Sequence, residues 1–371
     1  MRCISCTMDV PDGMFCTRCG RKQIEGSSRY AHYSAHPGEH VFHPGVLTTL
    51  FPHLGHEKLH QFRWAMLTGV ACVLLLDVAG LITAALLAAA FLVPILYLIY
   101  LYEAQVYKDE PAPVLGFTLG GGAVLGIVVT IIVKATTGDI AFRTFFSDDT
   151  STVLWLGLLV PLVQEVLKPI PALAIRLRGG FPERVDGLVF GVAAGLGFSV
   201  SECVVRFSAV LSSLPEHSEP ANWVYTLVTV SVLLPLLHGS ATGAIVCALW
   251  RIGEVSFRLR GLAVIGLALA AHVAFITGSQ LLNDRSFSQL LILSWQALIV
   301  GALLIVIRYM LHEALLEESV DMGFTEMQCH NCHHHVFANR FCPHCGKALA
   351  AMPGRPAATS AGTAPVVGLE V

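Results

Sequence analysis

The run TVLWLGLLVPLVQEVLKPIPALAIR spans residues 152–176 and is apolar except for a short polar insertion, Gln164-Glu165-x2-Lys168. Its length exceeds the roughly 20 residues that a helix needs to cross a bilayer. Ionisable side chains are costly at the bilayer centre and are rare there unless they pair or line a functional cavity. Glu165 and Lys168 are three positions apart, so they share a helix face. The run predicts a membrane-spanning helix with an ion pair inside it.

The composition indicates that this helix is one of several. Of the 371 residues, 54% are hydrophobic and 13% are charged, and the mean hydropathy is +0.67. A soluble globular protein has about 25% charged residues. The deficit of charge and the repeated apolar runs predict an all-α polytopic membrane protein in a lipid bilayer. The net charge of −3 gives no reason to expect a nucleic-acid partner.

Apolar runs of the right length predict about eight membrane spans. The longest, residues 64–102, is interrupted by Asp77 and Gly80 and is too long for one span, so it predicts two. An even number of spans puts both chain ends on the same side of the membrane. The expected spans are about 64–80, 82–103, 114–134, 152–176, 186–211, 223–250, 261–282 and 289–312.

The charges between the spans predict which side that is, because Lys and Arg favour cytoplasmic loops. With both ends inside the cell, the inner loops contain Lys108, Arg176, Arg178, Arg184, Arg251, Arg258 and Arg260. The outer loops contain Lys134, Arg143, Arg206 and Arg285, diluted by Asp139, Asp148, Asp149, Glu216, Glu219 and Asp284. We therefore expect a multi-pass protein of the cell membrane with both termini in the cytoplasm.

Two matching cysteine patterns lie near the chain ends. Paired CxxC knuckles in a short polar segment are typical of tetrahedral zinc ribbons, so we expect two structural zinc ions. Disulfide-paired termini are the alternative. Thiolate zinc sites favour a reducing compartment, in agreement with cytoplasmic ends. The patterns are Cys3-x2-Cys6-x9-Cys16-x2-Cys19 and Cys329-x2-Cys332-x9-Cys342-x2-Cys345, each followed by Gly.

These features divide the chain into five predicted parts. An N-terminal zinc ribbon, residues 1–23, precedes a His-rich linker, 24–62. We interpret the linker as solvated, with a metal-binding or pH-sensing role as the alternative. The membrane core, 63–313, is followed by the second zinc ribbon, 326–349. The tail, 350–371, is rich in Pro, Ala and Thr and is predicted to be disordered.

Three later spans each carry a polar residue that can meet the Glu165–Lys168 pair: Glu202, His238 and His272. Counted at 1.5 Å per residue, Glu165, His238 and His272 lie roughly 16–18 Å above the inner helix ends, and Glu202 roughly one to two turns further out. A shared level is not expected of polar residues that only hold helices together, which is the alternative interpretation. A carboxylate beside two imidazoles can act as a general base or hold a divalent metal.

Small residues and prolines surround these positions. Glycines at small-residue spacing allow helix backbones to approach closely, and prolines kink a helix and free its carbonyls. The glycines are Gly187, Gly191, Gly195 and Gly197 in the fifth span and Gly239 and Gly243 after His238, and the prolines are Pro161, Pro169 and Pro171.

Four motifs on four consecutive spans resemble those of the PrsW family of intramembrane proteases, which is related to the CAAX-processing and bacteriocin-processing membrane proteases. Gln164-Glu165-x2-Lys168 is similar to the family's Glu-Glu-x-x-Lys motif. The other three are Asp186-Gly187 with Gly195-x-Gly197-Phe198-x3-Glu202, then His238-x4-Gly243, then Ala271-His272. The resemblance covers about residues 64–312.

The resemblance implies hydrolysis of peptide bonds in membrane-anchored substrates, such as anti-sigma factors, by a metallo- or glutamate-type mechanism. It implies that Glu165 is an active-site carboxylate and that Lys168 orients or neutralises it. Glu202, His238 and His272 would hold the water or a metal and stabilise the oxyanion. The ribbons carry modest basic charge, so we expect them to bind a protein partner or to sense a signal rather than to bind nucleic acid.

The sequence departs from the family pattern at two positions. Gln164 stands where relatives have a first Glu, and an amide cannot accept a proton as a general base. Ile276 stands where relatives often have Asn, and Gln280 one turn later is a weak substitute. An inactive pseudoprotease that binds membrane segments is therefore the main alternative. A transporter is less favoured because the spans show no inverted repeat.

Overall fold

The structure is a computed structural model, and it describes residues 3, 6–8, 10, 15–19, 41, 60–103, 111–137, 155–179, 181–212, 220–250, 255–321, 326–338 and 341–349. Most of the His-rich linker and the whole tail lie outside the described residues. The chain forms two compact units. One unit combines Met1–Glu39 with Gly323–Val371, and the other is His40–Met322. The predicted domain boundaries stay a prediction.

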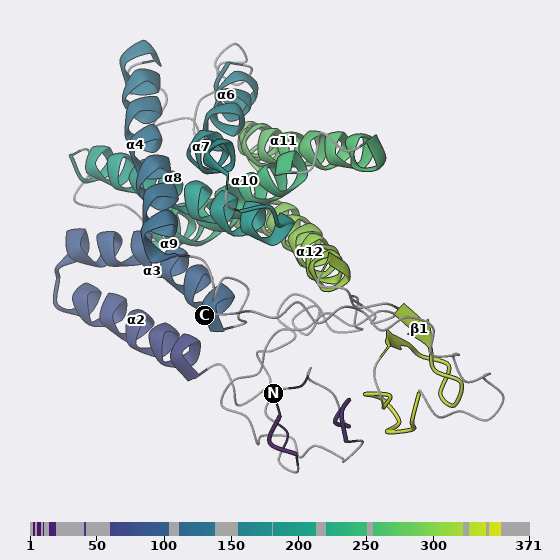
Figure 1. The fold of residues 1–371 in the computed structure, drawn as a ribbon. Helices are drawn as coiled ribbons and strands as arrows, with labels where there is room; N and C mark the ends of the chain where they lie inside the picture. Colours follow the sequence, from purple (N-terminus) through teal and green to yellow (C-terminus); the bar gives the residue numbers. More distant parts are fainter. Residues whose placement is uncertain are drawn as a thin grey trace, which may run out of the picture. The chain divides into compact units, whose positions relative to one another are not determined.

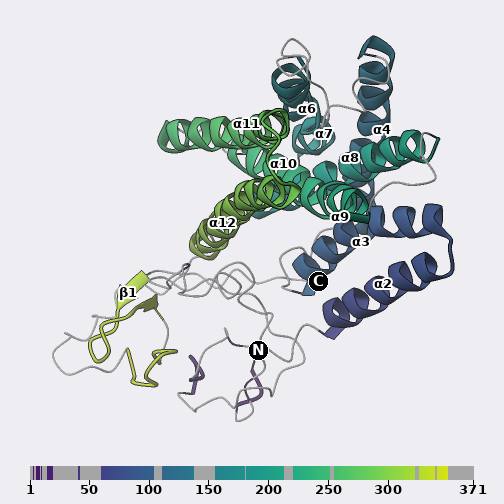
Figure 2. The same ribbon diagram turned by 180° about the vertical axis from the view of Figure 1, so that it is seen from behind.

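The described residues of the unit His40–Met322 are largely helical (Figures 1 and 2). They include eight helices long and apolar enough to cross a membrane, which confirms the expected number of spans. Two of them are composite and include a π-helical turn. The elements are α2 (His60–Val78), α3 (Ile82–Glu103), α4 (Ala112–Thr137), η3 (Trp155–Leu159), α6 (Val160–Leu167), α7 (Ile170–Arg178), α8 (Arg184–Ser212), α9 (Pro220–Val228), η4 (Thr229–Leu233), α10 (Leu234–Trp250), α11 (Val255–Asp284) and α12 (Gln289–Asp321).

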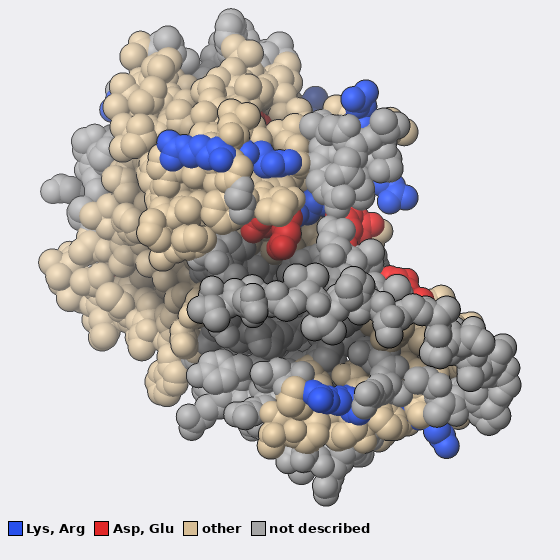
Figure 3. All heavy atoms as spheres, in the orientation of Figure 1, with Lys and Arg blue, Asp and Glu red and all other residues tan. Residues whose placement is uncertain are grey.

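The helices α8 and α10 form the centre of this unit. They pack against each other, and α4, α11 and α12 pack around them (Figure 1). In the spans that contain them, 83% of the apolar window is buried, whereas none of the window in α2 is. The outer helices expose mainly apolar side chains, and the surface of this unit in Figure 3 has few charges. This pattern is that of a lipid-facing surface around a packed core.

Glycines set the distance between the central helices, as the sequence predicts. A Cβ atom added at Gly195 of α8 would lie 2.3 Å from the carbonyl oxygen of His238 in α10. On the opposite side of α8, a Cβ at Gly197 would lie 1.9 Å from the carbonyl oxygen of Leu119 in α4. Any other residue would therefore push these helices apart. The α4 side of this contact also depends on Gly122, which the sequence analysis did not single out.

The two composite spans are interrupted just where the predicted site residues occur. Pro169 separates α6 from α7, and it has no N–H to donate to the carbonyl of Glu165 one turn earlier. The π-helical turns η3 and η4 precede Glu165 and His238 by a few residues. Single π-turns are frequent at functional sites because they rotate the following side chains. The prolines predicted the first interruption, but the π-turns were not predicted.

Two helices are longer than their apolar runs. The helix α11 begins at Val255 rather than near 261, and α12 continues to Asp321 rather than ending near 312. The last turns of α12 are held by an ion pair in which Arg184 Nη1 lies 2.5 Å from Glu317 Oε1. Hydropathy marks only the apolar part of a helix, so these polar extensions were not expected.

In the unit that contains both chain ends, the C-terminal segment forms a small hairpin. The strands β1 (Glu326–Gln328) and β2 (His335–Phe337) pair antiparallel, with Met327 opposite Val336. The turn between them carries Cys329 and Cys332. Such a hairpin with a CxxC turn is the expected local structure of a zinc ribbon.

Candidate active site

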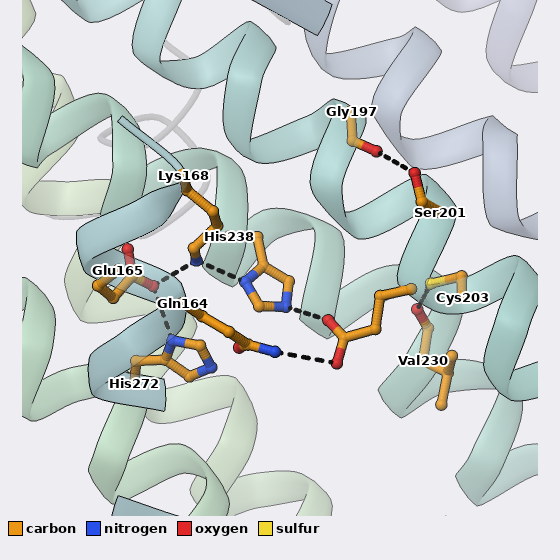
Figure 4. A network of polar contacts seen from close by, with 10 residues as sticks. Gln164, Glu165, Lys168, Gly197, Ser201, Cys203, Val230, His238 and His272 are labelled. Carbon is orange, nitrogen blue, oxygen red and sulfur yellow. Dashed lines mark hydrogen bonds and ion pairs between the residues drawn. The ribbon is translucent and has the colours of Figure 1, made fainter. Parts of the chain in front are cut away.

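Glu165 and Lys168 are both buried in the helical unit, with 2% and 0% of their surfaces exposed. The Lys168 ammonium donates a hydrogen bond to Glu165 Oε1, and its Nζ lies 2.7 Å from Nδ1 of His238 (Figure 4). The Lys168 side chain extends from the end of α6 to His238 in α10. A buried ion pair of this kind needs additional hydrogen bonds to offset its desolvation, and His238 provides one of them.

The contacts continue from His238 to α8. Because Nδ1 of His238 accepts from Lys168, we assign the ring proton to Nε2. This Nε2 lies 2.9 Å from Glu202 Oε2. The amide nitrogen of Gln164 donates to the other carboxylate oxygen, Glu202 Oε1, over 3.4 Å (Figure 4). Gln164 therefore contacts the second carboxylate of the site instead of supplying a carboxylate of its own.

His272 closes the network from α11. Its Nδ1 lies 2.7 Å from Glu165 Oε1, so that oxygen is shared by an ammonium and an imidazole. The rings of His238 and His272 are 4.9 Å apart between centroids and nearly perpendicular, at 83°. The structure thus brings together, from four separate spans, the predicted catalytic residues Glu165, Lys168, Glu202, His238 and His272.

Glu202 is closer to His238 than the depth count predicts. Counting along α8 placed it roughly one to two turns further out. The count treats helices as parallel and ignores the reach of the side chain. In the structure, α8 lies against α10 through Gly195, and the Glu202 side chain extends to His238.

The neighbours of Glu202 hold α8 in a fixed rotation. The hydroxyl of Ser201 donates to the carbonyl oxygen of Ala123 in α4 over 2.7 Å. The thiol of Cys203 donates to the carbonyl oxygen of Val230 in the π-turn η4 over 2.9 Å. Glu202 lies between these two anchors. No pattern in the sequence predicted this bond.

Phe198 forms an apolar wall beside the charged groups. Its ring centroid is 5.5 Å from Lys168 Nζ and 5.5 Å from the centroid of the His238 ring. An ammonium at this distance is attracted to the face of an aromatic ring. A wall of this kind also lowers the local dielectric constant, which strengthens the interactions among the buried charges.

Three of these residues can also hold a metal ion. One donor atom each from Glu165, His238 and His272 lies within 4.8 Å of the others. One carboxylate and two imidazoles are a donor set that zinc accepts. In addition, Oε2 of Glu165 is buried and has no hydrogen-bond partner among the described residues. The donor types and this open oxygen fit a metal ion with a bound water. Lys168 contacts two of the three ligands, Glu165 and His238.

The comparison with known protein families decides the identity of the core. The sequence model of the PrsW family intramembrane metalloproteases matches residues 110–307, more than half of the 371 residues. The chain belongs to this family. No curated protein and no solved structure matches it. The protein is therefore a multi-pass membrane peptidase with protein substrates, and the metalloprotease family implies a metal.

The matched region of this PrsW-family protein contains every membrane-embedded residue described above and both departures from the family pattern. Ile276 is packed in the apolar core with Phe275 and Leu303 and contributes no polar group to the network. Gln280 is 1% exposed, and neither polar atom of its amide has a hydrogen-bond partner among the described residues. The amide is thus available for a group that the described residues do not supply.

The zinc ribbons of this PrsW-family protein lie outside the matched region, and both have the geometry of a metal centre. The Sγ–Sγ distances are 3.7 Å for Cys3–Cys19 and 3.8 Å for Cys6–Cys16, and 3.7 Å for both Cys329–Cys345 and Cys332–Cys342. Tetrahedral Zn–S bonds of ~2.3 Å require about 3.8 Å between sulfurs. A disulfide requires about 2.05 Å. All eleven cysteines are free thiols, so the alternative of disulfide-paired termini is wrong.

One ribbon thiol is already biased toward the zinc-binding form. Burial opposes ionisation of Cys329, but hydrogen bonds from the backbone N–H groups of Cys332 and Asn331 and from neighbouring thiols together lower its pKa from 9.0 to about 7. Burial raises the pKa of Cys332 and Cys342 in the same ribbon. The thiolate is the form that binds zinc.

Proposed function

We propose that this protein hydrolyses peptide bonds in membrane-anchored protein substrates, with Glu165 as the catalytic base. One observation carries the proposal: the two oxygens of Glu165 have different surroundings. Oε1 contacts Lys168 and His272, whereas Oε2 is buried without a partner among the described residues. The carboxylate is thus held in one orientation with one oxygen left for a water molecule.

The reaction follows from these contacts. A water bound at Oε2 of Glu165 transfers a proton to the carboxylate as its oxygen attacks the scissile carbonyl carbon. The same proton is then available to the leaving amine. The Lys168 ammonium stabilises the negative charge that develops near Glu165, and the apolar wall of Phe198 increases this effect. The Lys168 ammonium has a third N–H besides those directed to Glu165 and His238, and this group can donate to the oxyanion. His238, held by Glu202, keeps Lys168 in place.

A metal ion fits this mechanism. Glu165, His238 and His272 would hold it, provided that Lys168 no longer donates to Nδ1 of His238, and from these ligand types we assign zinc. When bound, it would polarise the substrate carbonyl and lower the pKa of the attacking water. We likewise propose one structural zinc ion in each ribbon.

Gln164 has a positioning role in this proposal. Its amide donates to Glu202 Oε1, which orients Glu202 toward His238. The site therefore does not need a carboxylate at position 164 to be active. This favours an active peptidase over the pseudoprotease alternative.

We also propose that both termini face the cytoplasm of the cell. Five arginines gather at the inner ends of three helices: Arg176 and Arg178 at the end of α7, Arg184 at the start of α8, and Arg258 and Arg260 in the first turns of α11. The positive-inside rule assigns these ends to the cytoplasm.

Quantitative proteomics of membrane-protein fragments tests the function. Cells that lack the native chain are compared with cells that express either the wild type or His238→Ala. We expect fragments that appear only with the wild type. If the two expressing strains contain equal amounts of folded protein and all three strains give the same fragments, the chain is an inactive binder of membrane segments.

A further inference from the structure

The two ribbons are structural repeats of one another. The four cysteines of the first ribbon, and Phe15 between them, recur 326 positions later in the second as four cysteines and Phe341, so the two ribbons align without a gap. The backbone N–H of Cys3 donates to the Met8 oxygen, and that of Cys329 to the His334 oxygen, both over 2.9 Å. The matching residues Thr7 and His333 both have positive φ, at 57° and 56°. The first CxxC turn of each ribbon, which begins at Cys3 or Cys329, therefore has the same backbone conformation in both.

The two repeats contact each other through the same edge. The backbone N–H of Phe15 donates to the carbonyl oxygen of Pro343 over 3.1 Å. The backbone N–H of Phe341 donates to the carbonyl oxygen of Thr17, also over 3.1 Å. Phe15 matches Phe341 and Thr17 matches Pro343, so the two bonds are equivalent. Such a reciprocal pair is the pattern of a two-fold, self-complementary interface.

These bonds flank one metal ligand from each ribbon, Cys16 and Cys342. Both cysteines are fully buried, and each forms part of the second CxxC turn of its ribbon. The conformation of such a turn depends on its metal, because small zinc ribbons fold only when the ion is bound. Zinc binding in each ribbon therefore orders the backbone groups that contact the other ribbon.

A side-chain contact adds to the interface. A Cβ atom at Gly346 would lie 2.6 Å from Cδ1 of Phe15, so the Phe15 ring packs directly against this glycine. Gly346 also has a positive φ of 71° and donates its N–H to Cys342. Glycine at this position allows both the turn and the contact.

We propose that each zinc ribbon is the binding partner of the other, so that the two ends of one chain form a single two-zinc module. The module assembles only when both ribbons hold metal. This goes beyond the peptidase function and does not depend on it.

The small size of the contact explains why the partner is the same chain. Two backbone hydrogen bonds and one ring contact give little affinity between separate molecules. Attachment of both ribbons to one membrane unit raises their effective concentration to the millimolar range, which makes a weak contact sufficient. The eight spans return the two chain ends to the same side of the membrane, as this contact requires.

Photo-crosslinking of the full-length protein in membranes tests the proposal. The crosslinker p-benzoylphenylalanine replaces Phe15, and peptides are identified by mass spectrometry. We expect crosslinks to residues 341–346 within one chain, which a mixture of isotopically light and heavy chains distinguishes from crosslinks between chains. The same crosslinker at Met8, which is 42% exposed, is the control and should give little of this product.

Two variants test the proposal. The double variant Cys329→Ser and Cys332→Ser removes one zinc ion and should abolish the crosslink from position 15, although the first ribbon keeps its metal. Gly346→Val disturbs both the turn and the contact with Phe15, and it should also reduce the crosslink severalfold while the first ribbon retains its zinc. Crosslinks that persist in the double variant, or that form only between chains, would overturn the proposal.

Discussion

Among single residues, Lys168 makes the contacts on which the site depends most. Its ammonium is fully buried and contacts a carboxylate and an imidazole from two other positions, Glu165 and His238. The sequence predicted this pair from spacing alone. It also predicted that His238 can meet this pair, but not that His238 contacts Lys168, because helix periodicity gives the face of a residue and not which side chain packs on that face.

Replacing Lys168 by Met should destabilise the protein and inactivate it. The change leaves Glu165 as a buried carboxylate with His272 as its remaining partner in the network, and breaking a buried pair costs about 3–5 kcal/mol. We expect a lower unfolding temperature in detergent and at least a ~10²-fold loss of cleavage.

The double variant Lys168→Met with Glu165→Gln is the control for that experiment. It removes both charges, so it should be more stable than Lys168→Met alone. Equal stability of the two variants would show that the ion pair contributes nothing to folding.

Gln164→Glu should give no gain of cleavage. The substitution replaces the amide that donates to Glu202 by a second carboxylate at the same place, 3.4 Å away, where two like charges repel. Cleavage rates of the wild type and the variant, measured on the same substrate, check this prediction. A large gain would mean that the native site is impaired by Gln164.

The metal content of the protein tests whether His272 is a ligand of a metal ion in the membrane site. With both ribbons and the membrane site occupied, the protein should hold a metal ion in each of three groups, and His272→Ala should lose one of the three. Elemental analysis of the purified full-length chain gives the number directly. Identical metal content in the wild type and the variant would argue for the glutamate-type mechanism without metal.

Among the helices, α8 determines the geometry because it packs closely on both sides. Its glycines were predicted to allow this, and they do so through Gly195 toward α10 and Gly197 toward α4. The π-turns η3 and η4 could not be predicted, because their residues Trp155–Leu159 and Thr229–Leu233 are as apolar as the rest of each span. Only the packing of neighbouring helices distinguishes a π-turn from an α-helical turn there.

Gly195→Ala should therefore be destabilising. The new Cβ would lie 2.3 Å from the His238 carbonyl oxygen, and overpacking of this kind costs about 1–3 kcal/mol. The added methyl group should also displace His238 and reduce cleavage.

The matched control is Gly266→Ala in α11, where no atom lies within 4 Å of the added Cβ. Alanine there should be neutral or stabilise by about 0.5–1 kcal/mol. Equal unfolding temperatures for the two variants would contradict the close contact.

At the scale of the whole molecule, the sequence predicted the number of spans and their positions along the chain. It did not predict the pairing of the two ribbons. Apolar runs predict the spans because each helix satisfies its own backbone in the membrane. The contact of Phe15 with Pro343 joins residues at opposite ends of the chain, and no local pattern indicates it. The repeat of the cysteine spacing was the available signal, because equivalent units can pair through equivalent edges.

Both chain ends should lie on the cytoplasmic side of the membrane. Reporter fusions that are active only in the cytoplasm or only outside it, placed after Val371 and before Met1, should both give the cytoplasmic result. Opposite results at the two ends would exclude the eight-span arrangement, and two external results would reverse its orientation.

The most direct test of the central claim is the cleavage rate of Glu165→Gln. The substitution keeps the shape of the side chain and removes its ability to accept a proton. The purified wild type and variant are reconstituted in lipid vesicles with a membrane protein that the wild type processes, and Gln164→Glu is measured alongside. We predict a ~10²–10⁴-fold loss of cleavage per folded protein for Glu165→Gln, together with a lower unfolding temperature, because the buried Lys168 ammonium loses its carboxylate partner. A variant that cleaves within about twofold of the wild-type rate would contradict the assignment of Glu165 as the catalytic base.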